Sequence, residues 1–195
     1  MKLVFATHNS NKLIEVQKLI PDFIELLSLE QIGCSDEIAE TGSTLEANAQ
    51  IKVNYISKKY NLPCFSDDTG LLVDALNGAP GVYSARYAGE QKNADANMNK
   101  LLNELKPHQN RSAQFKTVIA LYLNNEKRLF KGTVKGSITK ERSGTAGFGY
   151  DPIFIPDGYT QTFAELSTDK KNAISHRARA MAQLIDFLET LSDTK

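Results

Sequence analysis

The stretch KLVFATHNSNKLIEVQKLI, residues 2–20, decides the fold class of this chain. Residues 2–7 form a short apolar run that is typical of a buried strand. In residues 9–20 the apolar side chains recur near helical spacing, and Pro21 follows the expected helix end. A strand, a short polar loop and a helix open an α/β unit. We therefore expect an α/β protein with a central mixed sheet flanked by helices.

The rest of the chain continues this alternation of strands and helices. Strands are expected at residues 24–29, 63–76, 112–123 and 128–138, and helices after residue 43, at 94–106 and at 175–191. Ser43 and Glu46 have the spacing of a capping box for the second helix. The strands at 112–123 and 128–138 are expected to form a hairpin across Asn124 and Asn125. The last helix is expected to turn one apolar line inward, formed by Ala178, Met181, Ile185 and Leu188.

Composition narrows the class of protein. The 195 residues are enough for one domain, which we place at 1–195. The chain carries 23 basic and 23 acidic residues, so it lacks the basic excess of a nucleic-acid binder. The apolar run at the N-terminus is too short for a signal peptide or a membrane span. Cys34 and Cys64 stand singly, without the spacing of a zinc site or a disulfide framework. We expect a cytoplasmic protein with no nucleic-acid or membrane partner.

The first strand-to-helix turn, ATHNSNK at residues 6–12, is a candidate phosphate site. Free backbone N–H groups and the helix dipole attract phosphate at such a position. The turn lacks the glycine and lysine spacing of a Walker A loop. The alternative interpretation is an ordinary Asn or Ser helix cap.

The segment SDDTG, residues 66–70, is a candidate metal site. Neighbouring residues on a strand point to opposite faces, so Asp67 and Asp68 are not expected to address one ligand. A single carboxylate holds Mg²⁺ when substrate phosphates complete its coordination shell, and Glu40 is the best second acidic ligand. The alternative is an acidic turn at a strand end.

Two further candidates carry cations and aromatic rings. Lys52 borders the apolar face of the second helix, where a lysine can also simply reach solvent. In GTAGFGYDPIF, residues 144–154, Phe148 and Tyr150 offer a flat face to a nucleobase and Asp151 offers an acceptor. The alternative is that these aromatic side chains fill the core.

The segment AISHRARA, residues 173–180, gathers positive charge at the start of the last helix. If Ser175 is the cap, His176 and Arg177 lie in the first turn, where cations oppose the helix dipole unless an anion or polar ligand offsets them. Lys171 adds to the same cluster. The alternative is a solvated helix end.

In their order along the chain, ATHNSNK, ETGSTLEANAQIK, SDDTGLLVDALNGAPGVYSARYAG, GFGYDPIF and KKNAISHRARA closely resemble the inosine triphosphate pyrophosphatase family. The resemblance runs from Lys2 to Leu191. Thr69 stands where serine is common in the family and Ala146 where glycine is common, and neither difference removes a charged group.

The resemblance implies two lobes with a nucleotide-binding cleft between them, usually in a homodimer. It implies Mg²⁺-dependent hydrolysis of deaminated purine nucleoside triphosphates (ITP, dITP and XTP) to the monophosphate and pyrophosphate, which keeps them out of DNA and RNA. Glu40 and Asp68 would hold Mg²⁺, with Asp68 also the proton acceptor. The residues implied to meet the substrate are Thr7, His8, Asn9, Ser10, Asn11, Lys12, Lys52, Thr69, Arg86, Phe148, Gly149, Tyr150, Asp151, Lys171, His176 and Arg177.

Base selection is expected to depend on hydrogen-bond donors. Inosine and xanthosine present an acceptor at C6 and a donor at N1, whereas adenine presents the reverse pattern. A donor such as Arg177, or a backbone N–H, aimed at O6 would therefore reject ATP. Three rival classes remain: a nucleotide-binding module without catalysis, a nucleic-acid binder, and a pyrophosphatase for modified pyrimidine triphosphates. The acidic candidates Glu40 and Asp68 favour an enzyme over a binding module.

Overall fold

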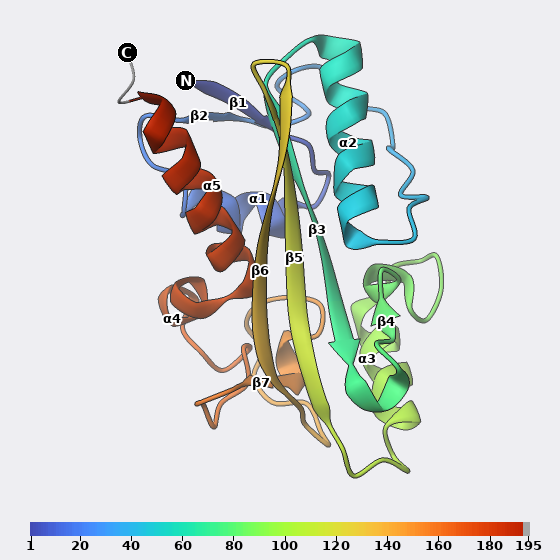
Figure 1. The fold of residues 1–195 in the computed structure, drawn as a ribbon. Helices are drawn as coiled ribbons and strands as arrows, with labels where there is room; N and C mark the ends of the chain where they lie inside the picture. The colour runs from blue at the N-terminus through green and yellow to red at the C-terminus, as the bar shows by residue number, and fades with distance from the viewer. Residues whose placement is uncertain (193–195) are drawn as a thin grey trace. The chain divides into compact units, whose positions relative to one another are not determined.

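The computed structural model, drawn in Figure 1, describes residues 1–192. These residues divide into two compact units. Unit 1 holds residues 1–68, 117–132 and the chain from 177 onward, and unit 2 holds residues 69–116 and 133–176. Two of the boundaries between the units fall between neighbouring candidate site residues. Asp68 ends a part of unit 1 and Thr69 begins a part of unit 2, while His176 ends a part of unit 2 and Arg177 begins a part of unit 1. A single domain over 1–195 stays a prediction.

The strands form one mixed sheet, which confirms the predicted α/β class. They are β1 (Lys2–Phe5), β2 (Glu25–Leu27), β3 (Cys64–Val73), β4 (Pro80–Gly81), β5 (Ser112–Leu123), β6 (Glu126–Ile138) and β7 (Phe154–Pro156). The order is β2-β1-β3-β5-β6-β7, with β4 paired to β3. The strand β1 runs parallel to both β2 and β3, whereas the pairs β3–β4 and β6–β7 are antiparallel. The expected hairpin is present, because β5 and β6 are neighbours joined by Asn124 and Asn125 at positive φ.

The helices are α1 (Ser10–Gln17), α2 (Leu45–Tyr60), α3 (Ala94–Glu104), α4 (Thr168–Ile174) and α5 (His176–Ser192). The predicted cap of α2 is wrong by one residue, because the Thr44 side chain, not that of Ser43, accepts from the Ala47 N–H. The short helix α4 was not predicted. The buried line of α5 also differs in part, since Ala180 and Leu184 are buried with Met181 and Leu188, while Ala178 and Ile185 are only half-buried.

In unit 1 the sheet carries apolar layers on both faces. Leu3, Phe5 and Phe65 pack with side chains of α1 and α5, whereas Val4 and Cys64 pack with α2. Figure 1 shows α2 on one side of β1 and β3 and α1 and α5 on the other. Within residues 64–68 of β3, the strand alternation therefore sends odd-numbered residues toward α1 and α5, and even-numbered residues toward α2.

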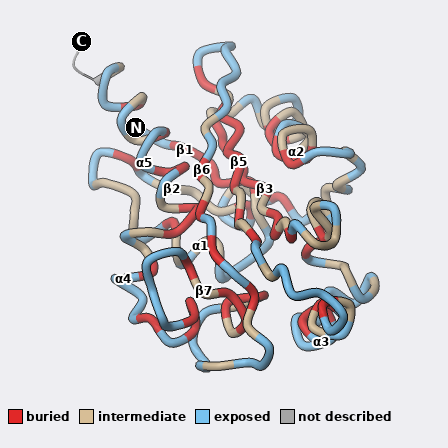
Figure 2. The backbone as a smooth tube through the Cα atoms, turned by 60° about the horizontal axis from the view of Figure 1, so that its bottom comes forward, coloured by how far each residue is buried: buried red, intermediate tan, exposed pale blue. Residues whose placement is uncertain are grey.

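Unit 2 has a separate core. Met98 and Leu101 of α3 and the helix-capping Leu105 pack in one apolar cluster with Phe115 and Phe163. Figure 2 shows buried residues along the strands, with exposed residues in many of the connecting loops. No helix in residues 1–192 is long and apolar enough to span a membrane.

Candidate functional site

The predicted phosphate turn is an exposed loop that ends in a capped helix. The Asn9 side chain caps α1 by accepting from the Lys12 backbone N–H at 3.1 Å, and the Thr7 hydroxyl accepts from the Asn9 N–H. His8, Asn9, Ser10 and Asn11 are exposed. Asn9 is therefore a helix cap, as the alternative interpretation expected, while the surface of the turn remains open to a ligand.

Lys12, the last residue of this turn, also forms an ion pair with a buried carboxylate. Lys12 Nζ lies 2.9 Å from Asp67 Oδ1. The other oxygen of Asp67 accepts from Arg177 Nε at 3.0 Å, and Arg177 Nη1 pairs with Glu15. Arg177 is only 2% exposed. Four charged side chains, from α1, β3 and the start of α5, thus form one network in unit 1 on the α1 and α5 side of the sheet.

Asp67 and Glu15 were not named among the candidate residues. The alternation along β3 places Asp67 on the same face as Phe65, so sequence parity predicts its direction but not its partners. Glu15 follows Lys12 by three residues on α1, which puts both on one helix face. No local pattern links Glu15 to Arg177, 162 positions away in the chain.

On the opposite face of the sheet, Lys52 pairs with one of the two predicted acidic residues, Glu40. Its Nζ lies 2.6 Å from Glu40 Oε1 and donates to the Asp67 carbonyl oxygen at 2.6 Å. Lys52 and Asp68 are each 7% exposed. Lys52 is therefore a buried cation at the carboxylates rather than a side chain that reaches solvent. Asp67 and Asp68 address opposite faces, as the strand parity predicts.

Burial and charge shift the pKa values in this group in different directions. Burial raises the pKa of Asp68 to about 6, against the opposing charges of Lys52 and Lys12. Burial also disfavours the charged form of Asp67, but the neighbouring Lys12 and Arg177 outweigh it and hold the pKa of Asp67 below its ordinary value. Burial lowers the pKa of Lys12. Asp68 is thus the carboxyl group whose proton affinity is set nearest neutrality.

Unit 2 brings together three of the residues predicted to meet the substrate: Phe148, Asp151 and Lys171. Lys171 Nζ lies 2.6 Å from Asp151 Oδ2, and both side chains are buried. The same carboxylate oxygen accepts from the Phe148 backbone N–H at 2.8 Å, and Lys171 Nζ stands 4.9 Å from the centre of the Phe148 ring. Gly147 has φ +76° and leaves no room for a Cβ, which would fall 2.1 Å from Asp151 Oδ2. Gly147 therefore allows the loop backbone to pass close to Asp151.

The aromatic residues of unit 2 divide between core and surface. The Tyr150 ring is buried in the core, and its hydroxyl donates to the Ser84 carbonyl oxygen. Phe148 is half-buried, so it is the one of this pair that keeps an exposed face. The His176 ring stacks on Phe115 with centroids 4.6 Å apart. His176 is held by the core of unit 2 and is not a solvated helix end.

The remaining candidates lie elsewhere in unit 2. Thr69 continues β3 beyond Asp68. The Arg86 guanidinium lies over the ring of Tyr83, 5.2 Å from its centre, and Tyr83 is exposed.

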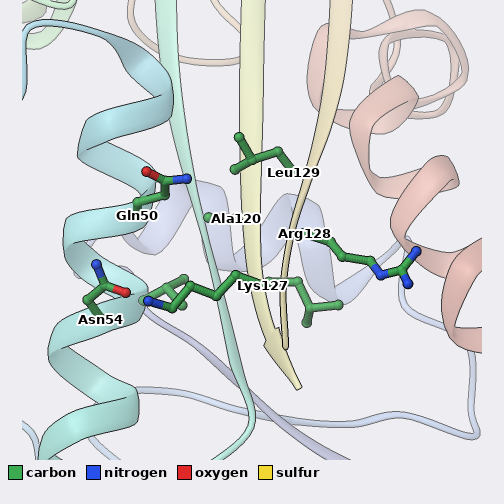
Figure 3. Close-up of a pocket in the computed structure, with 8 residues that line it drawn as sticks. Gln50, Asn54, Ala120, Lys127, Arg128 and Leu129 are labelled. Carbon is green, nitrogen blue, oxygen red and sulfur yellow. The ribbon is translucent and has the colours of Figure 1, made fainter. Parts of the chain in front are cut away.

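Unit 1 also has a small pocket between α2, β5 and β6 (Figure 3). Its volume is about 30 Å³, and Gln50, Asn54 and Lys127 are among the residues that line it. A ligand pocket for a molecule of drug size has roughly 300–1,000 Å³. This pocket is too small for a nucleotide.

Comparison with known proteins places the whole chain in one group. The family model described as the Ham1 family matches residues 3–187. A dITP/XTP pyrophosphatase of Flavobacterium johnsoniae is 58% identical over 96% of this chain and 98% of its own, and one of Flavobacterium psychrophilum is 56% identical over 97% and 100%.

Solved structures agree with the sequence comparison. The Staphylococcus aureus Ham1 protein has a TM-score of 0.89 at 42% identity, and the match covers 97% of this chain and 99% of the other. A HAM1 protein from Coxiella burnetii has a TM-score of 0.90 at 41% identity, with the same coverage. Fold, length and sequence therefore agree that this chain belongs to the Ham1 family.

Proposed function

We propose that this protein hydrolyses dITP, XTP and ITP to the nucleoside monophosphate and pyrophosphate, and so removes deaminated purines from the nucleotide pool. Relatives of matching length that are named dITP/XTP pyrophosphatase support the substrate class. The observation that carries the chemistry is the group of Lys52, Glu40 and Asp68 in unit 1, in which Lys52 and Asp68 are buried and Glu40 is partly exposed. Phosphoanhydride hydrolysis depends mainly on charge neutralisation, positioning and an oriented water, which this set of residues suits.

At the phosphate end, we assign binding to the exposed turn Thr7–Asn11, to Lys12 and to Lys52. Asp68 accepts a proton from the attacking water or orients that water. Its raised pKa, about 6, suits a general base that works near neutral pH. Asp67 supports this end by holding Lys12 and Arg177 in place.

The residues fit a magnesium ion that arrives with the nucleotide. Mg²⁺ in nucleotide enzymes is usually held by one or two carboxylates, with waters and phosphate oxygens completing the shell. Glu40 and Asp68 supply two such groups, and the charge of Glu40 contributes to the raised pKa of Asp68. Within residues 1–192 there is no cluster of three or more acidic, His or Cys ligands. When bound, Mg²⁺ would neutralise the phosphate oxygens.

At the base end, we assign recognition to unit 2. The ring of Phe148 offers an aromatic face to the base, and the backbone of Gly149 and Tyr150 offers polar groups. The side chains of Lys171 and His176 offer hydrogen-bond donors. Donors directed at O6 would accept inosine and xanthosine and leave buried groups unpaired against adenine. Because GTP shares the O6 and N1 pattern, its exclusion must act on the 2-amino group. Arg86 and Thr69 complete the proposed set.

The contacts of Arg177 change the role that we assign to it. Its Nε and Nη1 nitrogens are engaged by the carboxylates of Asp67 and Glu15 in unit 1. We therefore propose that Arg177 supports the phosphate end by fixing Asp67, and that its neighbour His176 serves the base.

The products of dITP hydrolysis test the proposed reaction. Incubation with Mg²⁺ followed by ion-exchange chromatography should give dIMP and pyrophosphate in equal amounts. Formation of dIDP and inorganic phosphate would contradict cleavage between the α and β phosphates.

A further inference from the structure

Asn48 is a fully buried polar side chain that the proposed site does not yet use. It lies on α2, one turn before Lys52, and its exposed fraction is 0%. Residues four apart on a helix share one face, so Asn48 and Lys52 face the same side of α2. A buried amide costs free energy unless both its oxygen and its nitrogen find partners.

The oxygen of the Asn48 amide holds the loop that carries Glu40. Asn48 Oδ1 accepts from the Gly42 backbone N–H at 2.7 Å. The contact is so close that a Cβ added at Gly42 would lie 2.7 Å from this oxygen and 2.7 Å from the Ala47 Cβ. The position of the Glu40 loop on α2 is therefore fixed by Asn48.

The nitrogen of the same amide faces the other carboxylate. Asn48 Nδ2 is buried and has no hydrogen-bond partner at bonding distance within residues 1–192. Ser66, two residues before Asp68 on β3, donates its hydroxyl to the Ala49 carbonyl oxygen at 2.6 Å, so this face of the strand lies against α2 next to Asn48. The even-numbered parity of Asp68 on β3 independently sends its side chain toward α2. The NH₂ group is thus presented to the Asp68 carboxyl group.

We propose that Asn48 is a positioning residue for the reaction proposed above: its oxygen fixes the Glu40 loop while its nitrogen orients Asp68. One rigid amide then sets the distance between the two carboxylates that are proposed to hold the metal. Only asparagine supplies both functions at this length. Leucine matches its size without polar atoms, and aspartate keeps an acceptor for Gly42 but offers no donor to Asp68.

The test compares the wild-type protein with Asn48→Leu and with a matched control, Asn54→Leu. Asn54 lies on the same helix, its amide oxygen is also buried without a partner in the described chain, and it lines the small pocket of Figure 3 rather than the carboxylate group. The measurements are kcat and KM for dITP, Mn²⁺ affinity without nucleotide by EPR titration, and Tm.

We expect Asn48→Leu to lower kcat and to weaken Mn²⁺ binding, each by at least about tenfold, because residues that orient metal ligands have effects of this size. KM for dITP should change less than about threefold. Asn54→Leu should stay close to the wild type in kcat and Mn²⁺ affinity. Asn48→Asp, which keeps the Gly42 contact, is the second variant should Asn48→Leu fail to fold, and its kcat should fall as well.

Wild-type kcat and Mn²⁺ affinity in folded Asn48→Leu would overturn the proposal, as would a loss confined to Tm. Absence of Mn²⁺ binding by the wild-type protein would overturn the role toward the metal. If the wild type releases no pyrophosphate from dITP, the proposed function fails, whereas the Mn²⁺ comparison still decides whether Asn48 positions the carboxylates.

Discussion

Two adjacent aspartates on β3 have opposite surroundings, and this difference separates their roles. Asp67 is matched by two cations, Lys12 and Arg177, and its pKa lies below the ordinary value. Asp68 lies on the other face, where burial raises its pKa to about 6. A paired carboxylate that is ionised at neutral pH suits a structural role, whereas one with a pKa near neutrality suits proton transfer.

Replacing Asp68 by Asn should lower kcat by about 10²- to 10⁴-fold, the usual contribution of a general base. KM for dITP should change much less, because Lys12 and Lys52 remain to bind the phosphates. Steady-state kinetics on protein with an unchanged circular dichroism spectrum measures both values. Turnover close to that of the wild type would remove Asp68 from its assigned role.

Replacing Asp67 by Asn should instead act on stability, because it leaves Lys12 and Arg177 buried without their shared carboxylate. Breaking a buried pair in this way costs about 3–5 kcal/mol. The matched control is Asp36→Asn, which breaks the exposed, solvent-screened pair with Lys59 and should cost much less. Urea unfolding measures both changes, and equal losses would contradict the assigned difference.

The same pair predicts a pH dependence. The lowered pKa of Asp67 means that its stabilisation is present above the ordinary pKa of 3.8 and is lost as the pH falls toward its folded pKa. The difference in unfolding free energy between wild type and Asp67→Asn should therefore shrink below about pH 4. A difference that stays constant between pH 6 and pH 3 would contradict this linkage.

At the residue scale, the sequence predicted the acidic and basic candidates better than it predicted their contacts. Strand parity correctly separated Asp67 from Asp68, and Lys52 lies at Glu40. The pair of Arg177 with Glu15 could not be predicted, because it depends on how α5 packs beside α1 rather than on any local pattern. The stacking of His176 on Phe115 could not be predicted either.

At the scale of elements, α2 organises the phosphate end. Its first turn follows the Glu40 loop, and its inner face carries Asn48 and Lys52. The start of this helix therefore affects both the loop and the carboxylates.

The cap of α2 offers a direct test of where the helix begins. Thr44→Ala should lower the unfolding free energy by about 1 kcal/mol, because the Ala47 N–H loses its acceptor. Ser43→Ala, at the position that the sequence pattern favoured, should change it by less than about 0.5 kcal/mol. Thermal or urea unfolding of both variants measures the difference, and a larger effect at Ser43 would contradict the observed cap.

The elements that the sequence predicted well are those with long apolar patterns, such as β5 and its hairpin with β6. The helix α4 was missed because seven residues, TDKKNAI, are too few to show an amphipathic period. Strand order was also beyond local patterns, since it depends on crossovers between segments distant in sequence.

At the scale of the whole molecule, the balanced charge means that binding of an anionic nucleotide does not rest on a net positive charge. The 23 basic residues equal the acidic ones in number. Four of the basic residues form ion pairs with carboxylates at the candidate sites: Lys12, Lys52, Lys171 and Arg177. Selectivity for a small anionic substrate then follows from a few sites rather than from net charge.

We propose that the protein forms a homodimer. Sedimentation equilibrium should give twice the chain mass of 21.6 kDa at micromolar concentration. A single species of one chain mass over the whole concentration range would contradict this proposal.

The most direct test of the central claim is kcat/KM for pyrophosphate release from dITP, XTP, ITP, dGTP and dATP, each with Mg²⁺ and with excess chelator. The account predicts values for the first three that exceed those for the last two by at least about 10²-fold. It also predicts no release from any substrate in chelator. Equal rates from all five would contradict the proposed base recognition in unit 2. No release from any of them by folded protein with Mg²⁺ would contradict the proposed function itself.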